Sequence, residues 1–257
     1  MLDERQSIVV IPARGGSKRF PRKNVASLNG KPLLSYAVAA GLHASCVDKT
    51  YVSTEDPEIA SIAIESGAEV PYERPAHLAK DDVIADTVVV DLINNIIERK
   101  GANISNVVLI QPTSPFVKAE HIDAAITLLN QRPDLSSVTT LSSVDHRFHP
   151  YNLSFKQGEG KWEFAFPEAR KNSLTRQSKP PSFSFANLFA ARVETFLSRG
   201  RFGESKGAVV VDPIYAWDID YEWELEIAEF FINRDMVDLT HHPYPSDAAS
   251  KTLQILS

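Results

Sequence analysis

The sequence predicts an α/β fold built on one mostly parallel sheet. Over the first part of the chain, short apolar runs alternate with segments of helical periodicity. This alternation is typical of parallel strands joined by crossover helices. The 257 residues suffice for one large domain with a single core. We therefore expect a single domain over 1–257, with at most a small appended lobe.

The elements follow this alternation in order. The predicted strands are 8–11, 49–53, 69–72, 107–110, 137–141 and 207–211. The predicted helices are 32–42, 57–66, 84–100, 119–130 and 222–232. The second helix has clear end signals, because Asp56 can cap it, Pro57 suits its first position and Gly67 suits its end. Residues after Asn233 are expected to form a tail.

The residue composition of the chain changes at Ser142. Aromatic, basic, proline and glycine residues become frequent, and two short strands are predicted at 153–156 and 161–166. A long excursion of this kind often leaves the core to cover a pocket or a partner subunit. We expect a small β-rich lobe over 142–186.

Composition excludes several functions and compartments. The formal charge is −6, so a broad basic face for nucleic acid is not expected. Cys46 is the only cysteine, which rules out an intramolecular disulfide and favours a reducing cytoplasm. The first residues lack the pattern of a signal peptide, and no window has the roughly 20 apolar residues of a membrane span.

A cluster of cations follows the first predicted strand, in "IPARGGSKRFPRKNV" at residues 11–25. Loops at the carboxyl edge of a parallel sheet usually form the ligand crevice. There Gly15 and Gly16 can bring backbone N–H groups close to phosphate oxygens, while Arg and Lys supply countercharge. The loop is neither a Walker A motif nor a dinucleotide fingerprint. The alternative is a solvated basic turn.

A second polar loop follows the predicted strand 107–110. "QPTSP" at 111–115 should place Gln111, Thr113 and Ser114 at the same sheet edge. Amide and hydroxyl groups suit the neutral polyol face of a sugar. The alternative is a proline-bracketed turn whose hydroxyls bond within it.

A pair of carboxylates lies near the end of the chain, in "DID". Asp218 and Asp220 point the same way if the segment is extended, while Ile219 points to the core. Hard oxygen ligands of this kind suit Mg²⁺ bound to nucleotide phosphates. Asp220 could instead, or in addition, cap the following helix.

Together these segments resemble the acylneuraminate cytidylyltransferases, the CMP-sialic acid synthetase family. The resemblance rests on the first loop with "NGKPLLSYAV", on "VSTEDPEIASIAIESGAEVPYERPAHLAKDD", on "LIQPTSPFV" and on "WDIDYEWELEIAE". It implies a Rossmann-like sheet of the nucleotide-diphospho-sugar transferase type. It also implies CMP transfer from CTP to a sialic-acid-like ulosonic acid, with Mg²⁺, pyrophosphate release and a homodimer whose insert reaches the partner's active site.

The resemblance also implies a role for each matching residue. The nucleotide-binding set is Arg14, Gly15, Gly16, Ser17, Lys18, Lys23, Asn24, Arg74 and Asp81. Within it the resemblance places Lys23 nearest the reacting phosphate, with Arg14 and Lys18 as further catalytic cations. Fixed cations of this kind would offset the charge that builds on the leaving pyrophosphate. For Arg74 the structural alternative is an ion pair with Glu73 or Asp82.

The acceptor half of the resemblance departs from the family pattern at two positions. Asn152 stands where sialic-acid-using members carry a lysine, and Leu188 stands where a glycine is expected. Such a leucine would reshape the sugar pocket. Arg176 and Asn187 persist as acceptor-binding residues, and Arg176 could pair with the substrate carboxylate.

Three alternatives stay open at this point. A 3-deoxy-manno-octulosonate (Kdo) cytidylyltransferase shares the plan of the first loop, although Lys23-Asn24 argues against it. CMP transfer to another anionic acceptor, such as a phosphonate, is also compatible. A nucleotide-sensing module would keep the fold without catalysis, and the presence of Lys23, Asp218 and Asp220 argues against that reading.

Overall fold

A computed structural model of the chain describes residues 5–238. The predicted α/β class is confirmed. The first four residues and most of the predicted tail after Asn233 lie outside the described part. Within 5–238, no helix is both long and apolar enough to cross a membrane.

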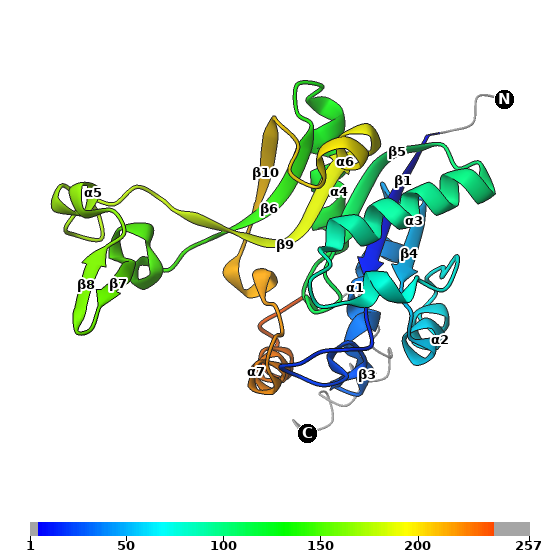
Figure 1. Cartoon of the computed structure of the whole chain (residues 1–257), viewed down its shortest axis with the longest axis horizontal. Helices are drawn as coiled ribbons and strands as arrows, with labels where there is room; N and C mark the ends of the chain where they lie inside the picture. Colours follow the sequence, from blue (N-terminus) through cyan, green and yellow to red (C-terminus); the bar gives the residue numbers. More distant parts are fainter. Residues whose placement is uncertain (1–4, 239–257) are drawn as a thin grey trace, which may run out of the picture.

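A six-stranded sheet forms the centre of the molecule (Figure 1). Its spatial order is β10-β6-β9-β5-β1-β4. The strands are β1 (Gln6–Pro12), β4 (Lys49–Ser53), β5 (Ile104–Ile110), β6 (Ser137–Ser143), β9 (Phe183–Arg192) and β10 (Lys206–Val211). β1 pairs in parallel with β4 and β5, and β10 pairs in parallel with β6. β9 runs antiparallel to its neighbours β5 and β6. The sheet is therefore mostly parallel, as predicted.

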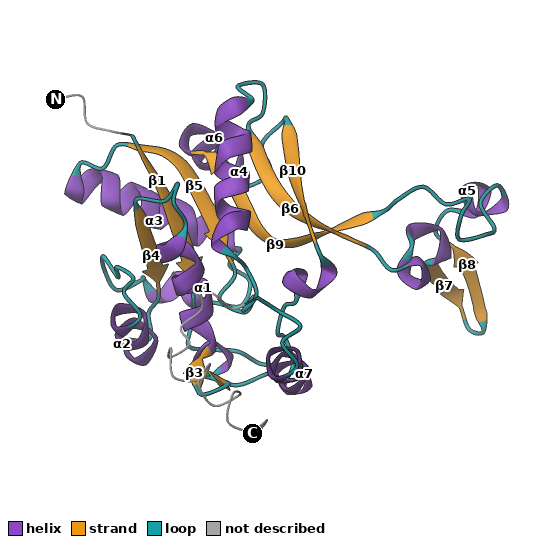
Figure 2. Cartoon of the chain, turned by 180° about the vertical axis from the view of Figure 1, so that it is seen from behind, coloured by secondary structure: helices purple, strands orange, loops and turns teal. Residues whose placement is uncertain are grey.

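Helices cover both faces of this sheet, as the two opposite views show (Figures 1 and 2). Val9 and Ile11 of β1 pack with α1 (Leu33–His43), α2 (Pro57–Glu65) and α4 (Ala119–Gln131). Ile8 and Val10 point to the other face, against α3 (Ala85–Lys100) and α6 (Val193–Arg199). Because side chains alternate along a strand, one apolar run in β1 supplies both cores.

A third apolar cluster lies beyond the carboxyl edge of the sheet. It joins α7 (Glu222–Asn233) to the small β2–β3 hairpin (Ser27–Leu28 and Lys31–Pro32). Ile219 is fully buried in this cluster, whereas its neighbours Asp218 and Asp220 are not. The predicted alternation of this segment is therefore present, and it anchors both carboxylates next to the first loop.

A slender arm extends away from the body between β6 and β9 (Figure 1). It carries the hairpin β7 (Ser154–Gly158) and β8 (Lys161–Phe164), and the short helix α5 (Pro167–Lys171). The arm contains fewer residues than the lobe predicted over 142–186. β6 and β9 still pair at Ser142 with Ser184 and at Ser143 with Phe183, so those residues belong to the sheet.

Two parts of the predicted element order are wrong. The predicted strand 69–72 is only a bridge between Glu69 and Tyr51. Pro71 has no N–H with which to continue the ladder, which explains why pairing stops there. β9 and α6 were not predicted, because the apolar half of β9 follows the polar and aromatic texture of the arm without a break in composition.

Candidate functional site

A cleft of about 350 Å³ opens at the carboxyl ends of β1 and β5. It brings together four segments that are distant in the sequence: the first loop, the stretch after Arg74, the loop after β5 and the "DID" segment. The predicted site residues that line it are Arg14, Gly16, Ser17, Lys23, Asn24, Arg74, Asp81, Gln111, Thr113, Asp218 and Asp220. The convergence of parallel strands at one edge explains this assembly.

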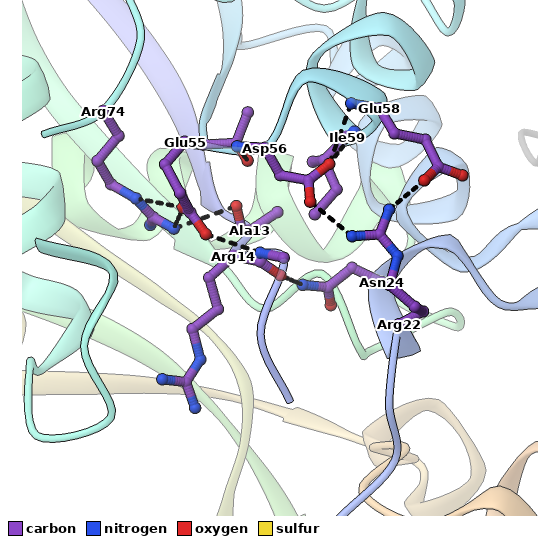
Figure 3. A network of polar contacts seen from close by, with 11 residues as sticks. Ala13, Arg14, Arg22, Asn24, Glu55, Asp56, Glu58, Ile59 and Arg74 are labelled. Carbon is purple, nitrogen blue, oxygen red and sulfur yellow. Dashed lines mark hydrogen bonds and ion pairs between the residues drawn. The ribbon is translucent and has the colours of Figure 1, made fainter. Parts of the chain in front are cut away.

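The first loop is tied to itself and to the turn after β4 (Figure 3). Asn24 donates from Nδ2 to the carbonyl oxygen of Arg14 at 2.9 Å, which closes the loop across ten residues. The N–H of Gly15 donates to Oε1 of Glu55 at 2.8 Å. A Cβ at Gly15 would lie 2.3 Å from Oδ2 of Asp56, so only glycine fits this approach. The N–H of Gly15 therefore holds the shape of the loop, and Gly16 is the glycine that lines the cleft.

Arg74 lies behind the loop and is 3% exposed. Its guanidinium pairs with Glu55 and donates from Nη2 to the carbonyl oxygen of Ala13 at 3.3 Å (Figure 3). The alternative that paired Arg74 with Glu73 or Asp82 is thus wrong. Burial acts to raise the pKa of Glu55, but hydrogen bonds from Arg74 and Gly15 outweigh it and hold that pKa below its ordinary value.

Asp81 pairs with two of the predicted phosphate-binding cations. Its carboxylate lies 2.7 Å from Nη1 of Arg14 and 2.5 Å from Nζ of Lys18. The hydrogen bond from Lys18 is the main reason why the pKa of Asp81 lies below its ordinary value. The Lys18 side chain is 82% exposed and does not line the cleft, but it pairs with Asp81, which does.

The two carboxylates of "DID" have different partners. Oδ1 of Asp218 accepts hydrogen bonds from Thr113 at 2.5 Å and from Ser114 at 3.1 Å. Asp218 is open to the cleft, yet the protein atoms around it displace bulk water, and this desolvation raises its pKa despite the Thr113 hydroxyl and the nearby Lys23 charge. Asp220 accepts from Lys23 at 2.7 Å and from Arg19 at 3.1 Å, and Lys23 is the main cause of its lowered pKa.

Within residues 5–238, no group of three or more His, Cys, Asp or Glu side chains is arranged to hold a metal ion. Asp218 and Asp220 nevertheless lie close enough for the charge of Asp220 to raise the pKa of Asp218. Two carboxylates beside a loop that is predicted to bind phosphate fit Mg²⁺, which commonly takes one or two protein carboxylates and completes its shell with water and phosphate oxygens.

The loop after β5 contributes in two ways. Gln111 and Thr113 line the cleft, and their role toward an acceptor stays a prediction. Ser114 is fully buried and its hydroxyl is bound to Asp218, so the structure shows it holding a carboxylate in place.

The remaining predicted acceptor residues lie outside this cleft. Arg176 lines a separate cavity of about 480 Å³ where the arm joins the body, together with His149 and Lys179. Asn187 is 3% exposed and donates to the carbonyl oxygen of Tyr215 at 2.9 Å. Their roles toward an acceptor stay predictions.

The two departures from the family pattern also have defined surroundings. Leu188 is fully buried in the core of the sheet. Its side chain packs in the core and lines neither of the two cavities described above, and its effect on a sugar pocket stays a prediction. Asn152 lies within the arm, in a short 3-10 helix (Pro150–Asn152) that contacts α5, and its Oδ1 accepts from Arg170 at 2.5 Å and from Lys179 at 2.8 Å.

Sequence reasoning missed Glu55, which joins Arg74 to the first loop. The signal for it was available, since Glu55 closely follows β4 at the same sheet edge. The apolar wall of the cleft was missed as well. It consists of Leu78, Val83, Ala85 and Val88.

Known proteins resemble this chain in sequence and in fold. A family model described as cytidylyltransferase matches residues 8–155. The chain is 41% identical over 121 residues to the CMP-N,N'-diacetyllegionaminic acid synthase of Legionella pneumophila, a match that covers 47% of this chain and 52% of that protein. The chain thus spans about half the length of this relative.

A second relative matches over nearly its whole length. The pseudaminic acid cytidylyltransferase of Campylobacter jejuni is 29% identical over 231 residues, which is 87% of this chain and 95% of that protein. Among solved structures, CMP:2-keto-3-deoxy-manno-octonic acid synthetase complexed with CTP superposes with a TM-score of 0.67 and 15% identity, covering 90% of this chain and 99% of that one. This structural likeness concerns the fold.

Proposed function

The chain belongs to the cytidylyltransferase family, and on that premise we propose that it transfers CMP from CTP to a nonulosonic, sialic-acid-like acid with release of pyrophosphate. One observation carries the proposal: the cleft gathers Arg14 and Lys23 of the first loop, the polar loop after β5 and two carboxylates around one space. Phosphoryl transfer requires positioning and countercharge more than covalent chemistry, and this set supplies both.

The cations would act on the triphosphate. Lys23 has a side chain only 13% exposed, which fixes its ammonium at the cleft. Its partner is Asp220, and the partner of Arg14 and Lys18 is Asp81. A triphosphate carries more negative charge than either carboxylate and would compete for these cations. Positive groups held at the leaving pyrophosphate stabilise the transition state.

Asp218 and Asp220 would hold Mg²⁺, which would supply positive charge against the phosphate groups. The chain's own contribution is to keep both carboxylates at the cleft. Buried Ile219 anchors the segment between them, and the hydroxyls of Thr113 and Ser114 orient Asp218. These two hydroxyls both bind Oδ1, so Oδ2 of Asp218 is the oxygen with lone pairs available for a cation.

The acceptor would lie beside Gln111 and Thr113, which line the cleft from the loop after β5. The names of the relatives support an acid of the legionaminic or pseudaminic type. Arg176 and Asn187 are proposed as further acceptor residues. The Arg176 guanidinium lines its cavity beside the cation Lys179, and two cations at one cavity would attract a carboxylate.

We also propose a homodimer formed through the arm, in a reducing cytoplasm. Large apolar side chains on the arm are exposed, including Phe155 at 64% and Trp162 at 62%. The hairpin has no core of its own to bury them within residues 5–238, and a second copy of the chain would cover them.

Pyrophosphate release from CTP and Mg²⁺, measured over a panel of ulosonic acids, tests the proposal. Turnover with pseudaminic, legionaminic or sialic acid is expected. Turnover with Kdo alone would show that the acceptor is Kdo and not a sialic-acid-like acid. Tight CTP binding without turnover on any acid would indicate a nucleotide sensor.

A further inference from the structure

Arg22 has an unusual backbone conformation immediately before Lys23. Its φ is 58° and its ψ is 24°, in the left-handed region, and it precedes the short 3-10 helix Lys23–Val25. Residues with a Cβ adopt this region uncommonly, and asparagine or glycine usually occupies it. An arginine here therefore needs contacts that hold it in place.

Two carboxylates from the start of α2 supply those contacts (Figure 3). Nη1 of Arg22 lies 2.5 Å from Oδ2 of Asp56, and Nη2 pairs with Glu58. The planar guanidinium thus spans two acidic groups at one helix start, a geometry that lysine cannot reproduce. The Asp56 hydrogen bond is the main cause that raises the pKa of Arg22.

Asp56 has a second task at the same place. Its Oδ1 accepts from the N–H groups of Glu58 and Ile59, both at 3.0 Å, and so caps α2. Its position is therefore set by the helix and does not depend on Arg22. The carboxylate also packs against Gly15. The capping residue of α2 therefore contacts the first loop near its beginning, at Gly15, and near its end, at Arg22.

We propose that Arg22 is a positioning residue that sets the direction of Lys23 through its clamp on Asp56 and Glu58. Arg22 does not line the cleft, whereas Lys23 follows it directly and lies with its Nζ 2.7 Å from Asp220. With the guanidinium held, the left-handed turn at Arg22 fixes where the next Cα–Cβ bond points. Without the clamp the turn relaxes and the ammonium of Lys23 leaves its site. This proposal rests on the proposed function for its effect on catalysis.

The test compares Arg22→Gln and Asp56→Asn with the parent enzyme. The asparagine of the second variant can still cap α2 through its amide oxygen, so this change removes the charge of the clamp and keeps the helix start. We expect kcat to fall about 10- to 100-fold in each variant, with KM for CTP changed much less. The double variant should be no slower than Arg22→Gln alone, because that change already removes the contact with Asp56.

A matched control is Arg132→Gln, which removes an exposed pair of the same type with Asp134, at the end of α4. Surface ion pairs contribute little to stability, so all variants should melt close to the parent and the control should keep its kcat. A folded Arg22→Gln enzyme with parental kcat, or additive losses in the double variant, would overturn the clamp.

A second measurement needs no substrate and separates this proposal from the proposed function. Amide hydrogen exchange over residues 14–25, without added nucleotide, should be faster in Arg22→Gln than in the parent and unchanged in Arg132→Gln. Equal exchange in Arg22→Gln and parent would refute the clamp even in an active enzyme. A parent that releases no pyrophosphate with any acid would refute the proposed function, and the exchange data would still decide on the clamp.

Discussion

The ammonium of Lys23 lies 2.7 Å from Oδ1 of Asp220, although 197 residues separate the two in the sequence. The pair joins the first loop to the "DID" segment near the end of the described chain. It places the cation proposed for catalysis directly beside the carboxylates proposed for Mg²⁺. The candidate phosphate site and the candidate metal site therefore share one ion pair.

Replacing Lys23 by alanine should abolish turnover and leave the fold intact. The ammonium is the proposed countercharge for the reacting phosphate, and loss of one such group typically costs about 10²- to 10³-fold in kcat. Pyrophosphate release measures the loss, and far-UV circular dichroism checks the fold. Lys49→Ala is the control, because Lys49 pairs with Glu69 at the amino end of β4, away from the cleft. Near-parental turnover in Lys23→Ala would show that the loop does not hold the triphosphate.

Asp218→Asn and Asp220→Asn should each weaken the dependence on Mg²⁺. Asparagine keeps an oxygen for the Thr113 hydroxyl but removes the negative charge that attracts the cation. The concentration of Mg²⁺ for half-maximal rate should rise at least about 10-fold. Titrating the rate with Mg²⁺ at saturating CTP measures this, and Asp134→Asn is an exposed control. Unchanged titration curves in both variants would contradict the metal site.

The charge of Glu55 should stabilise the folded chain at neutral pH and lose this effect in acid. Its pKa is lowered in the folded chain, so its contribution is complete above its ordinary value of 4.5 and is lost as pH falls through the lowered folded value. The stability advantage of the parent over Glu55→Gln should therefore be greatest near neutral pH and shrink in acid. Urea midpoints between about pH 7 and pH 3 measure the difference.

The exposed Glu168 provides the control for that experiment, since its carboxylate pairs with Lys171 on the surface of the arm. Glu168→Gln should follow the parent at every pH. A parent advantage over Glu55→Gln that stays constant into acid would mean that the Glu55 charge contributes nothing.

Trp162→Glu and Phe155→Glu should each convert the proposed dimer to a monomer. Both side chains are exposed on the arm, and a buried charge at an apolar interface is costly. Sedimentation velocity of each variant beside the parent measures the change. Ile64→Glu is the control, because Ile64 is 60% exposed on α2, in the body. A parent that sediments as a monomer would rule out the arm as a stable interface.

The sequence predicted the sheet best where the signals are local. The strand 49–53 has the same bounds in the structure, and the cap of α2 by Asp56 is confirmed. The prediction failed where pairing depends on distant partners. β9 lies between β5 and β6 and pairs with both in the antiparallel sense. The residue pattern within Phe183–Arg192 does not indicate which strands will be its neighbours.

Short-range sequence was enough to specify the chemistry available: a basic glycine-containing loop after a buried strand, a polar loop after another, and two carboxylates separated by one apolar residue. Alternation and strand ends are properties of neighbouring residues, so they can be read locally. The partners of these groups became clear from the folded chain alone. There Arg74 pairs with Glu55, Leu188 fills the core, and Arg22 is held against α2. These contacts join residues that are distant in the sequence and meet only after the strands align. Which charged side chain pairs with which therefore depends on the tertiary structure.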